Sequence, residues 1–101
     1  MLLNDFPKVN RASLGKKIDF YFLELLESIF TSLYLPLAQK IIKLSSAIAK
    51  LDALKFFLQL AWENKCISQE KYAFLSSQLD EIGKMLGGWK KGLEQKTPAP
   101  V

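Results

Sequence analysis

The sequence contains no histidine and a single cysteine, Cys66. Without an imidazole the chain can form neither a Ser/His nor a Cys/His nucleophile pair, and it lacks the His and Cys clusters that usually bind transition metals. One cysteine cannot form an intramolecular disulfide, which fits a reducing, cytoplasmic setting. The residue inventory therefore predicts a protein that is not an enzyme, with no catalytic residue, no metal site and no cofactor.

Long apolar runs are also missing. No uninterrupted run approaches the ~20 residues of a membrane span, and the N-terminal region lacks the pattern of a cleaved signal peptide. We therefore expect no membrane partner. The 101 residues leave room for one domain, and 50% of them are hydrophobic. Because so short a chain buries only part of its surface, this composition predicts a homo-oligomer.

Residues that break helices are few: the chain has four prolines and five glycines, and β-branched residues are sparse. Apolar periodicity predicts three long helices, at about 13–34, 37–64 and 69–92. Ser13 and Ser68 are the expected N-caps of the first and third helices. The predicted fold class is all-α, an up-down helical bundle. The expected domain organisation is an N-terminal segment 1–12, a helical domain 13–93 and a disordered tail 94–101.

The predicted middle helix carries two apolar stripes, whereas each of the other helices has one apolar face. The first stripe can pack against the other two helices. The second stripe lies roughly opposite and requires an additional helix or another subunit, since a contiguous apolar patch is rarely left in water. It predicts an oligomer or partner interface at Ile42, Ala49, Ala53, Phe56 and Leu60.

The formal net charge is +4, and the basic residues are grouped near the start of the first helix and the end of the third. Such groups favour binding of an RNA or DNA backbone, although solvated helix faces are the simpler explanation of the same charges. Lys55 interrupts the first apolar stripe, so it must reach the edge or meet a carboxylate or phosphate. The candidate nucleic-acid-binding residues are Lys8, Arg11, Lys16, Lys17, Lys50, Lys55, Lys84, Lys90 and Lys91.

Glycines cluster in the third predicted helix, together with Trp89. We expect Gly83 to mark a close approach of two helices and the pair Gly87 and Gly88 to mark a helix end. A phosphate-binding loop is not expected, because no strand precedes these glycines. Trp89 continues the apolar seam and is therefore expected in the core.

The stretch from Leu79 to Trp89, LDEIGKMLGGW, closely resembles the EIGRMLGGW signature of the Avd-type four-helix proteins, the accessory variability determinants of diversity-generating retroelements. Three further segments resemble that family in the same order. Residues 6–15 are similar to its FPK..R..LG segment, residues 51–63 to its LD.LR and LA.E segments, and residues 67–72 to its IS...Y segment. The resemblance spans about residues 6–91.

The resemblance implies an antiparallel bundle of the four-helix type, in which three long helices are readable here. It implies assembly as a ring-like pentamer, binding to nucleic acid and to a reverse transcriptase, and support of mutagenic copying of template RNA into cDNA without catalysis. The basic positions carried over are Arg11, Lys17, Lys55 and Lys84, with lysine instead of the usual arginine at the last two.

The family usually has another helix before the segment that begins at Phe6. We expect either that a neighbouring subunit replaces this helix or that the chain assembles differently. Related bundles encoded in ribosomal RNA intervening sequences offer a less specific resemblance and an alternative function, a helical oligomeric scaffold without nucleic-acid binding. A helical module on an anionic membrane surface is a third interpretation.

Overall fold

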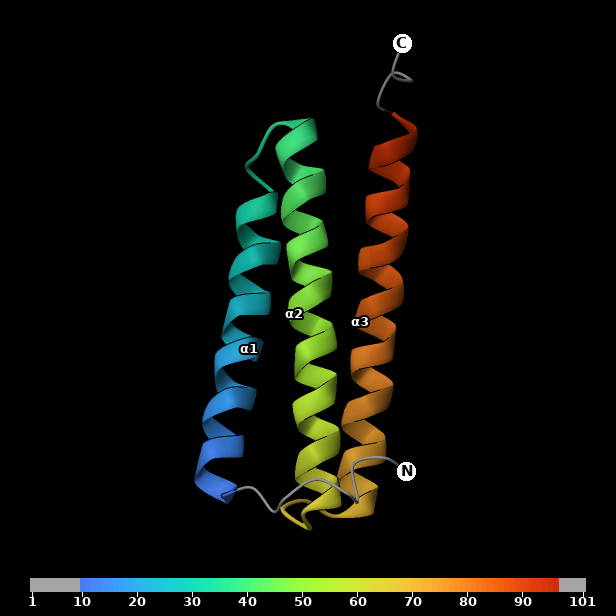
Figure 1. Cartoon of the computed structure of the whole chain (residues 1–101). Coiled ribbons are helices and arrows are strands. Elements are labelled where there is room, and N and C mark those ends of the chain that lie inside the picture. The colour runs from blue at the N-terminus through green and yellow to red at the C-terminus, as the bar shows by residue number, and fades with distance from the viewer. Residues whose placement is uncertain (1–9, 97–101) are drawn as a thin grey trace.

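The computed structural model describes residues 10–96, which form three long helices: α1 (Arg11–Ser32), α2 (Leu37–Glu63) and α3 (Gln69–Gln95). The chain runs up α1, down α2 and up α3 (Figure 1). Helix α2 lies in the middle, because it packs against both α1 and α3, whereas α1 and α3 do not pack closely against each other. The prediction of three long helices is confirmed, and residues 10–96 contain no fourth helix and no strand.

Helices α1 and α3 begin at side-chain caps, although one cap differs from the prediction. Asn10, not Ser13, caps α1: its side-chain oxygen accepts a hydrogen bond from the Ala12 N–H at 2.7 Å. At the start of α3, Ser68 is the N-cap as predicted, and its hydroxyl accepts from the Lys71 N–H at 3.1 Å. Both caps satisfy N–H groups that have no partner within the helix.

The predicted helix end at Gly87 and Gly88 is wrong. Helix α3 continues through both glycines as far as Gln95 and so enters the segment 94–101 that was predicted to be a tail. Each glycine costs the helix about 1 kcal/mol relative to alanine, but burial of Leu86 and Leu93 on either side holds the helix against α2. The rest of that tail, residues 97–101, lies outside the described residues.

The core follows the side of α2 that faces both neighbours. Leucines of all three helices and one alanine make up most of it: Leu25, Leu44, Ala47, Leu51, Leu54, Leu58, Leu79, Leu86 and Leu93. Three small residues are also buried: Ser28 and Ser32 on α1, and Ala47 on α2. Ser32 satisfies its hydroxyl within α1 by donating to the Ile29 carbonyl at 2.7 Å.

Helix α3 approaches α2 closely at Gly83, as predicted. A Cβ at this position would lie 3.3 Å from the Leu51 Cδ2 atom. Nearer the turn, the Trp62 and Tyr72 rings stack with a centroid distance of 4.7 Å. Trp89 is half-buried and packs against the core, which confirms its predicted place. The apolar residues of α3 that belong to the core or pack against it are Tyr72, Leu75, Leu79, Ile82, Leu86, Trp89 and Leu93.

The turn between α2 and α3 ends α2 with a Schellman motif. The Cys66 N–H donates to the Ala61 carbonyl at 2.8 Å and the Lys65 N–H donates to the Trp62 carbonyl at 2.9 Å. Lys65 takes the left-handed conformation with φ of 59°, a position that glycine usually occupies. Arg11 ties the start of α1 to this turn, because its guanidinium donates to the Cys66 carbonyl at 3.0 Å.

None of the helices among residues 10–96 combines the length and the apolar character needed to pass through a bilayer.

Candidate nucleic-acid and partner interfaces

The structure divides the predicted nucleic-acid-binding residues according to whether a carboxylate lies nearby. Three lysines are paired, and the pairs, with their N–O distances, are Lys50–Glu24 at 3.6 Å, Lys55–Asp80 at 3.0 Å and Lys84–Glu81 at 3.7 Å. A phosphate would have to compete with the carboxylate at each of these lysines. Lys55 was predicted to reach the edge or to meet a carboxylate or phosphate, and the structure gives it a carboxylate partner, Asp80.

Four other predicted lysines form no ion pair within residues 10–96: Lys16, Lys17, Lys90 and Lys91. Lys16 and Lys17 lie in the second turn of α1, because the helix begins at Arg11 and not at Ser13. Arg11 uses its guanidinium in the hydrogen bond to Cys66, so that group already has a structural partner. Lys8 lies outside the described residues.

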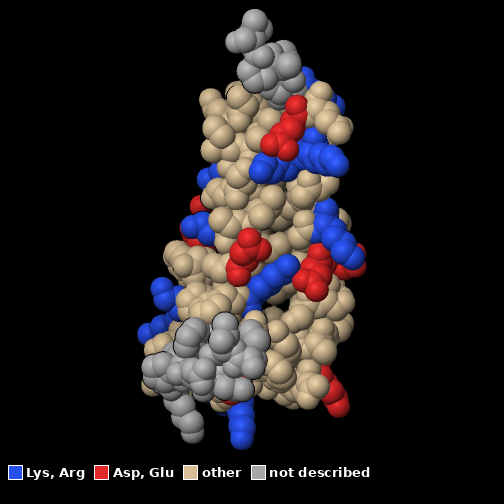
Figure 2. Space-filling model, turned by 45° about the vertical axis from the view of Figure 1, so that its right-hand side comes forward, with Lys and Arg blue, Asp and Glu red and all other residues tan. Residues whose placement is uncertain are grey.

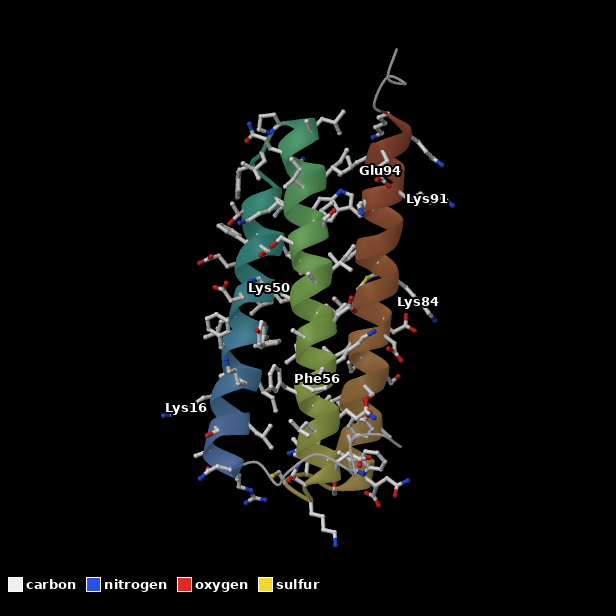
Figure 3. All side chains as sticks on the ribbon, viewed as in Figure 1. Lys16, Lys50, Phe56, Lys84, Lys91 and Glu94 are labelled. Carbon is white, nitrogen blue, oxygen red and sulfur yellow. The ribbon has the colours of Figure 1, made fainter. Side chains whose placement is uncertain are left out.

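The two basic groups lie toward opposite ends of the molecule. In Figure 3, Lys16 extends outward from the lower part of α1, whereas Lys84 and Lys91 lie higher, along α3. This separation follows from α1 and α3 running in the same direction. On the face shown in Figure 2, basic and acidic side chains are interspersed along the molecule and do not form one continuous basic area. On this face the two basic groups are therefore not joined.

The interface predicted on α2 is exposed over most of its length. Ile42 is 70% exposed, Phe56 is also exposed, Ala49 is exposed and Ala53 is half-buried. Leu60 is the exception, and its assignment to an exposed interface is wrong because only 5% of it is accessible. Near the turn, Leu60 joins a small apolar cluster with Leu14 and Ala61. The accessible part of the predicted interface therefore runs from Ile42 to Phe56 and ends before Leu60.

A second apolar surface, which the sequence analysis missed, lies between α1 and α3. Here a groove with a volume of about 190 Å³ has its floor on α2, and its lining residues are Ile18, Asp19, Phe22, Leu54, Leu58, Leu75 and Leu79. Further along, Leu26 of α1 and Leu33, the residue after α1, are also exposed. Periodicity predicted one apolar face on α1 and expected it to be buried. The structure covers only half of that face, because α3 packs on α2 and leaves α1 open.

Residues 10–96 contain no cluster of three or more His, Cys, Asp or Glu side chains that could hold a metal ion. The Cys66 thiol is half-buried in the turn between α2 and α3, and its sulfur lies 3.8 Å from the Asn64 carbonyl oxygen. The features of the described surface are lysines without ion pairs, which suit an anionic ligand, and exposed aromatic and aliphatic side chains, which suit an apolar partner.

Comparison with known proteins identifies the family of this chain. No curated protein and no solved structure matches the chain significantly. A family model described as bAvd-like matches residues 1–93, which is nearly the whole chain and includes all of α1 and α2 and most of α3. The chain belongs to the bAvd-like family of Avd-type accessory proteins.

Proposed function

We propose that the protein is a non-catalytic, cytoplasmic accessory factor of a diversity-generating retroelement. In this function it binds template RNA or cDNA together with a reverse transcriptase and supports mutagenic reverse transcription. The observation that carries the proposal is the match of the bAvd-like family over residues 1–93. The lysines without carboxylate partners supply a physical reason why a polyanion would bind.

Nucleic-acid binding rests on these lysines. If four phosphates are neutralised, raising the salt from about 50 to about 200 mM should weaken binding roughly 50- to 150-fold, because counterions are released. A filter-binding titration at several salt concentrations measures this slope. A matched pair of double variants tests which lysines act. Lys90→Gln with Lys91→Gln removes unpaired cations, whereas Lys50→Gln with Lys84→Gln removes the same charge from ion pairs. The first double variant should weaken binding more.

Association with a reverse transcriptase is tested separately. We expect a reverse transcriptase gene beside the gene of this protein, flanked by paired template and variable repeats. When the two proteins are produced together, the tagged chain should retain the polymerase through washes at moderate salt. Failure of the two purified proteins to associate, with or without template RNA, would contradict the proposed partner.

Assembly as a ring-like pentamer is part of the same proposal, and the exposed apolar surfaces support self-association. The open apolar groove between α1 and α3 is the place where a further helix would pack in a bundle of the four-helix type. The stripe at Ile42, Ala49, Ala53 and Phe56 offers a second contact surface. In native mass spectrometry a pentamer would have a mass about five times that of the 11.5 kDa chain. A stable monomer at micromolar concentration would refute this part.

A second candidate function is a helical scaffold or adaptor without nucleic-acid binding, like the bundles encoded in ribosomal RNA intervening sequences. The observation that favours it is the interspersed charge in Figure 2 together with the open apolar groove. Undetectable binding of RNA and DNA at about 50 mM salt, where phosphate contacts are strongest, would favour the scaffold.

A further inference from the structure

An exposed phenylalanine on α1 lines a surface hollow together with two lysines. Phe20 is 49% exposed, and it lines a shallow hollow of about 430 Å³ with Ser13, Lys16 and Lys17. These four residues are spaced three and four apart, so they share one face of the helix. The volume falls within the range typical of small-molecule sites. Among residues 10–96, no carboxylate lines the hollow.

The ring of Phe20 is held by its neighbours. Its centroid lies 5.1 Å from that of Tyr21 in an edge-to-face arrangement, and Tyr21 in turn stacks on Phe57 of α2 at 5.6 Å. Tyr21 and Phe57 are half-buried, so this contact anchors the exposed ring to the bundle. A ring that is already held in place loses little conformational freedom when another flat group stacks on it.

The acidic residues nearest in sequence are directed elsewhere. Asp19 lines the groove between α1 and α3, away from the hollow. Glu24 pairs with Lys50, whose ammonium lies 6.0 Å from the centre of the Tyr21 ring. Lys16 and Lys17 have no ion-pair partner within the described part of the chain. The hollow therefore combines positive charge with an open aromatic face.

We infer that the hollow over Phe20 binds one nucleotide of a single-stranded RNA or DNA, with the base stacked on the ring and the adjacent phosphates held by Lys16 and Lys17. This inference rests on the proposed nucleic-acid-binding function and names the form of nucleic acid that is bound. A single strand is required because bases in a duplex are already stacked on each other and cannot reach an exposed ring.

The test compares Phe20→Ala with Phe30→Ala. Phe30 is a matched control, since it is an exposed phenylalanine of α1 in an edge-to-face pair, with Tyr34, but has no lysine within four residues. Fluorescence anisotropy with single strands of about 12 nucleotides, RNA and DNA, reports the Kd of each variant. Phe20→Ala should raise the Kd about five-fold or more, the size expected for loss of one base stack. Phe30→Ala should leave it unchanged.

An abasic strand separates stacking from charge. The full chain with Phe20 should bind the base-bearing strand more tightly than the abasic strand, and Phe20→Ala should remove that difference without changing the salt dependence. Lys16→Gln with Lys17→Gln should instead reduce the salt slope by about 1.4, since each phosphate contact to a single strand contributes about 0.7. Circular dichroism of each variant serves as the control for folding.

Phe20→Trp provides a readout that does not depend on removing the ring. Its indole fluorescence should be quenched by the base-bearing strand, after subtraction of the signal from Trp62 and Trp89 measured in the unmodified chain. Equal affinities of Phe20→Ala and Phe30→Ala for single strands, or absence of quenching in Phe20→Trp, would overturn the site and leave nucleic-acid binding intact. Failure of the unmodified chain to bind any RNA or DNA at about 50 mM salt would instead refute the proposed function and this inference together.

Discussion

Leucine at position 83 should not stabilise the bundle and should destabilise it by up to about 2 kcal/mol, although leucine is a better helix former than glycine. A Cβ at Gly83 would already lie 3.3 Å from Leu51 Cδ2, which is tighter than most such contacts. Leu51 is only 1% exposed and belongs to the core, so it has little room to move. The extra atoms of leucine must enter this interface between α2 and α3, where overpacking costs about 1–3 kcal/mol.

Gly87 supplies the control for the same substitution. It lies in the same helix, but a Cβ there would meet nothing within 4 Å. Both substitutions gain about 1 kcal/mol from helix propensity. Gly87→Leu should therefore stabilise the protein by about that amount. Gly83→Leu should end between neutral and about 2 kcal/mol less stable once the overpacking cost is included.

Thermal denaturation followed by circular dichroism measures the difference, with all variants at the same protein concentration because assembly affects Tm. For a chain of this length, 1 kcal/mol corresponds to about 4–8 °C. Gly87→Leu should have the highest Tm, Gly83→Ala an intermediate Tm and Gly83→Leu the lowest. Alanine at position 83 ranks above leucine because it requires only a small shift of Leu51. An equal rise in Tm for the two leucine variants would refute the close approach of α2 and α3.

Three further outcomes test particular contacts. Lys55→Glu should bring a second carboxylate beside Asp80 and lower the free energy of unfolding by up to about 1 kcal/mol, a small value because the lysine side chain is 36% exposed. Adding Asp80→Lys should restore stability in urea denaturation, and Lys71→Glu, at an exposed position, should have no effect; failure of the charge swap would argue against the pair. Lys65→Gly should raise the urea midpoint, corresponding to about 1 kcal/mol, because glycine accepts the positive φ without strain; a lower midpoint would contradict the turn geometry. Phe22→Glu should reduce the mass of the assembly in native mass spectrometry while helicity is retained, and an unchanged mass would exclude the groove as a contact surface.

Helix positions were predictable because they depend on neighbours in sequence. Apolar spacing located all three helices, and the Ser68 cap followed from a serine just before the third helix with Glu70 in its first turn. The first cap was misassigned because both Asn10 and Ser13 have capping side chains. Arg11 lies between these candidates and bonds to the Cys66 carbonyl 55 residues away, and such a distant contact is not visible in local sequence.

Whether each predicted site residue is paired, buried or exposed depends on residues that are far away in the sequence. The sequence indicated that Lys55 had to reach the edge of the bundle or meet an anion, but only the packing of α3 on α2 identified Asp80 as its partner. Leu60 looked like part of an interface because its spacing matches Phe56 and Ala53, yet it is buried with Leu14 of α1. The sequence alone predicted no binding role for Phe20. Its neighbours Lys16 and Lys17, one turn earlier, were the signal that could have drawn attention to it.

The amino-acid sequence by itself determined three helices, their apolar faces, the family signature and the shortage of catalytic side chains, because all of these are properties of residue type and short-range spacing. The tertiary structure decided which lysines are paired, which apolar residues remain exposed and where the groove lies. Those features depend on how α1 and α3 sit around α2, which brings together side chains that are far apart in the chain.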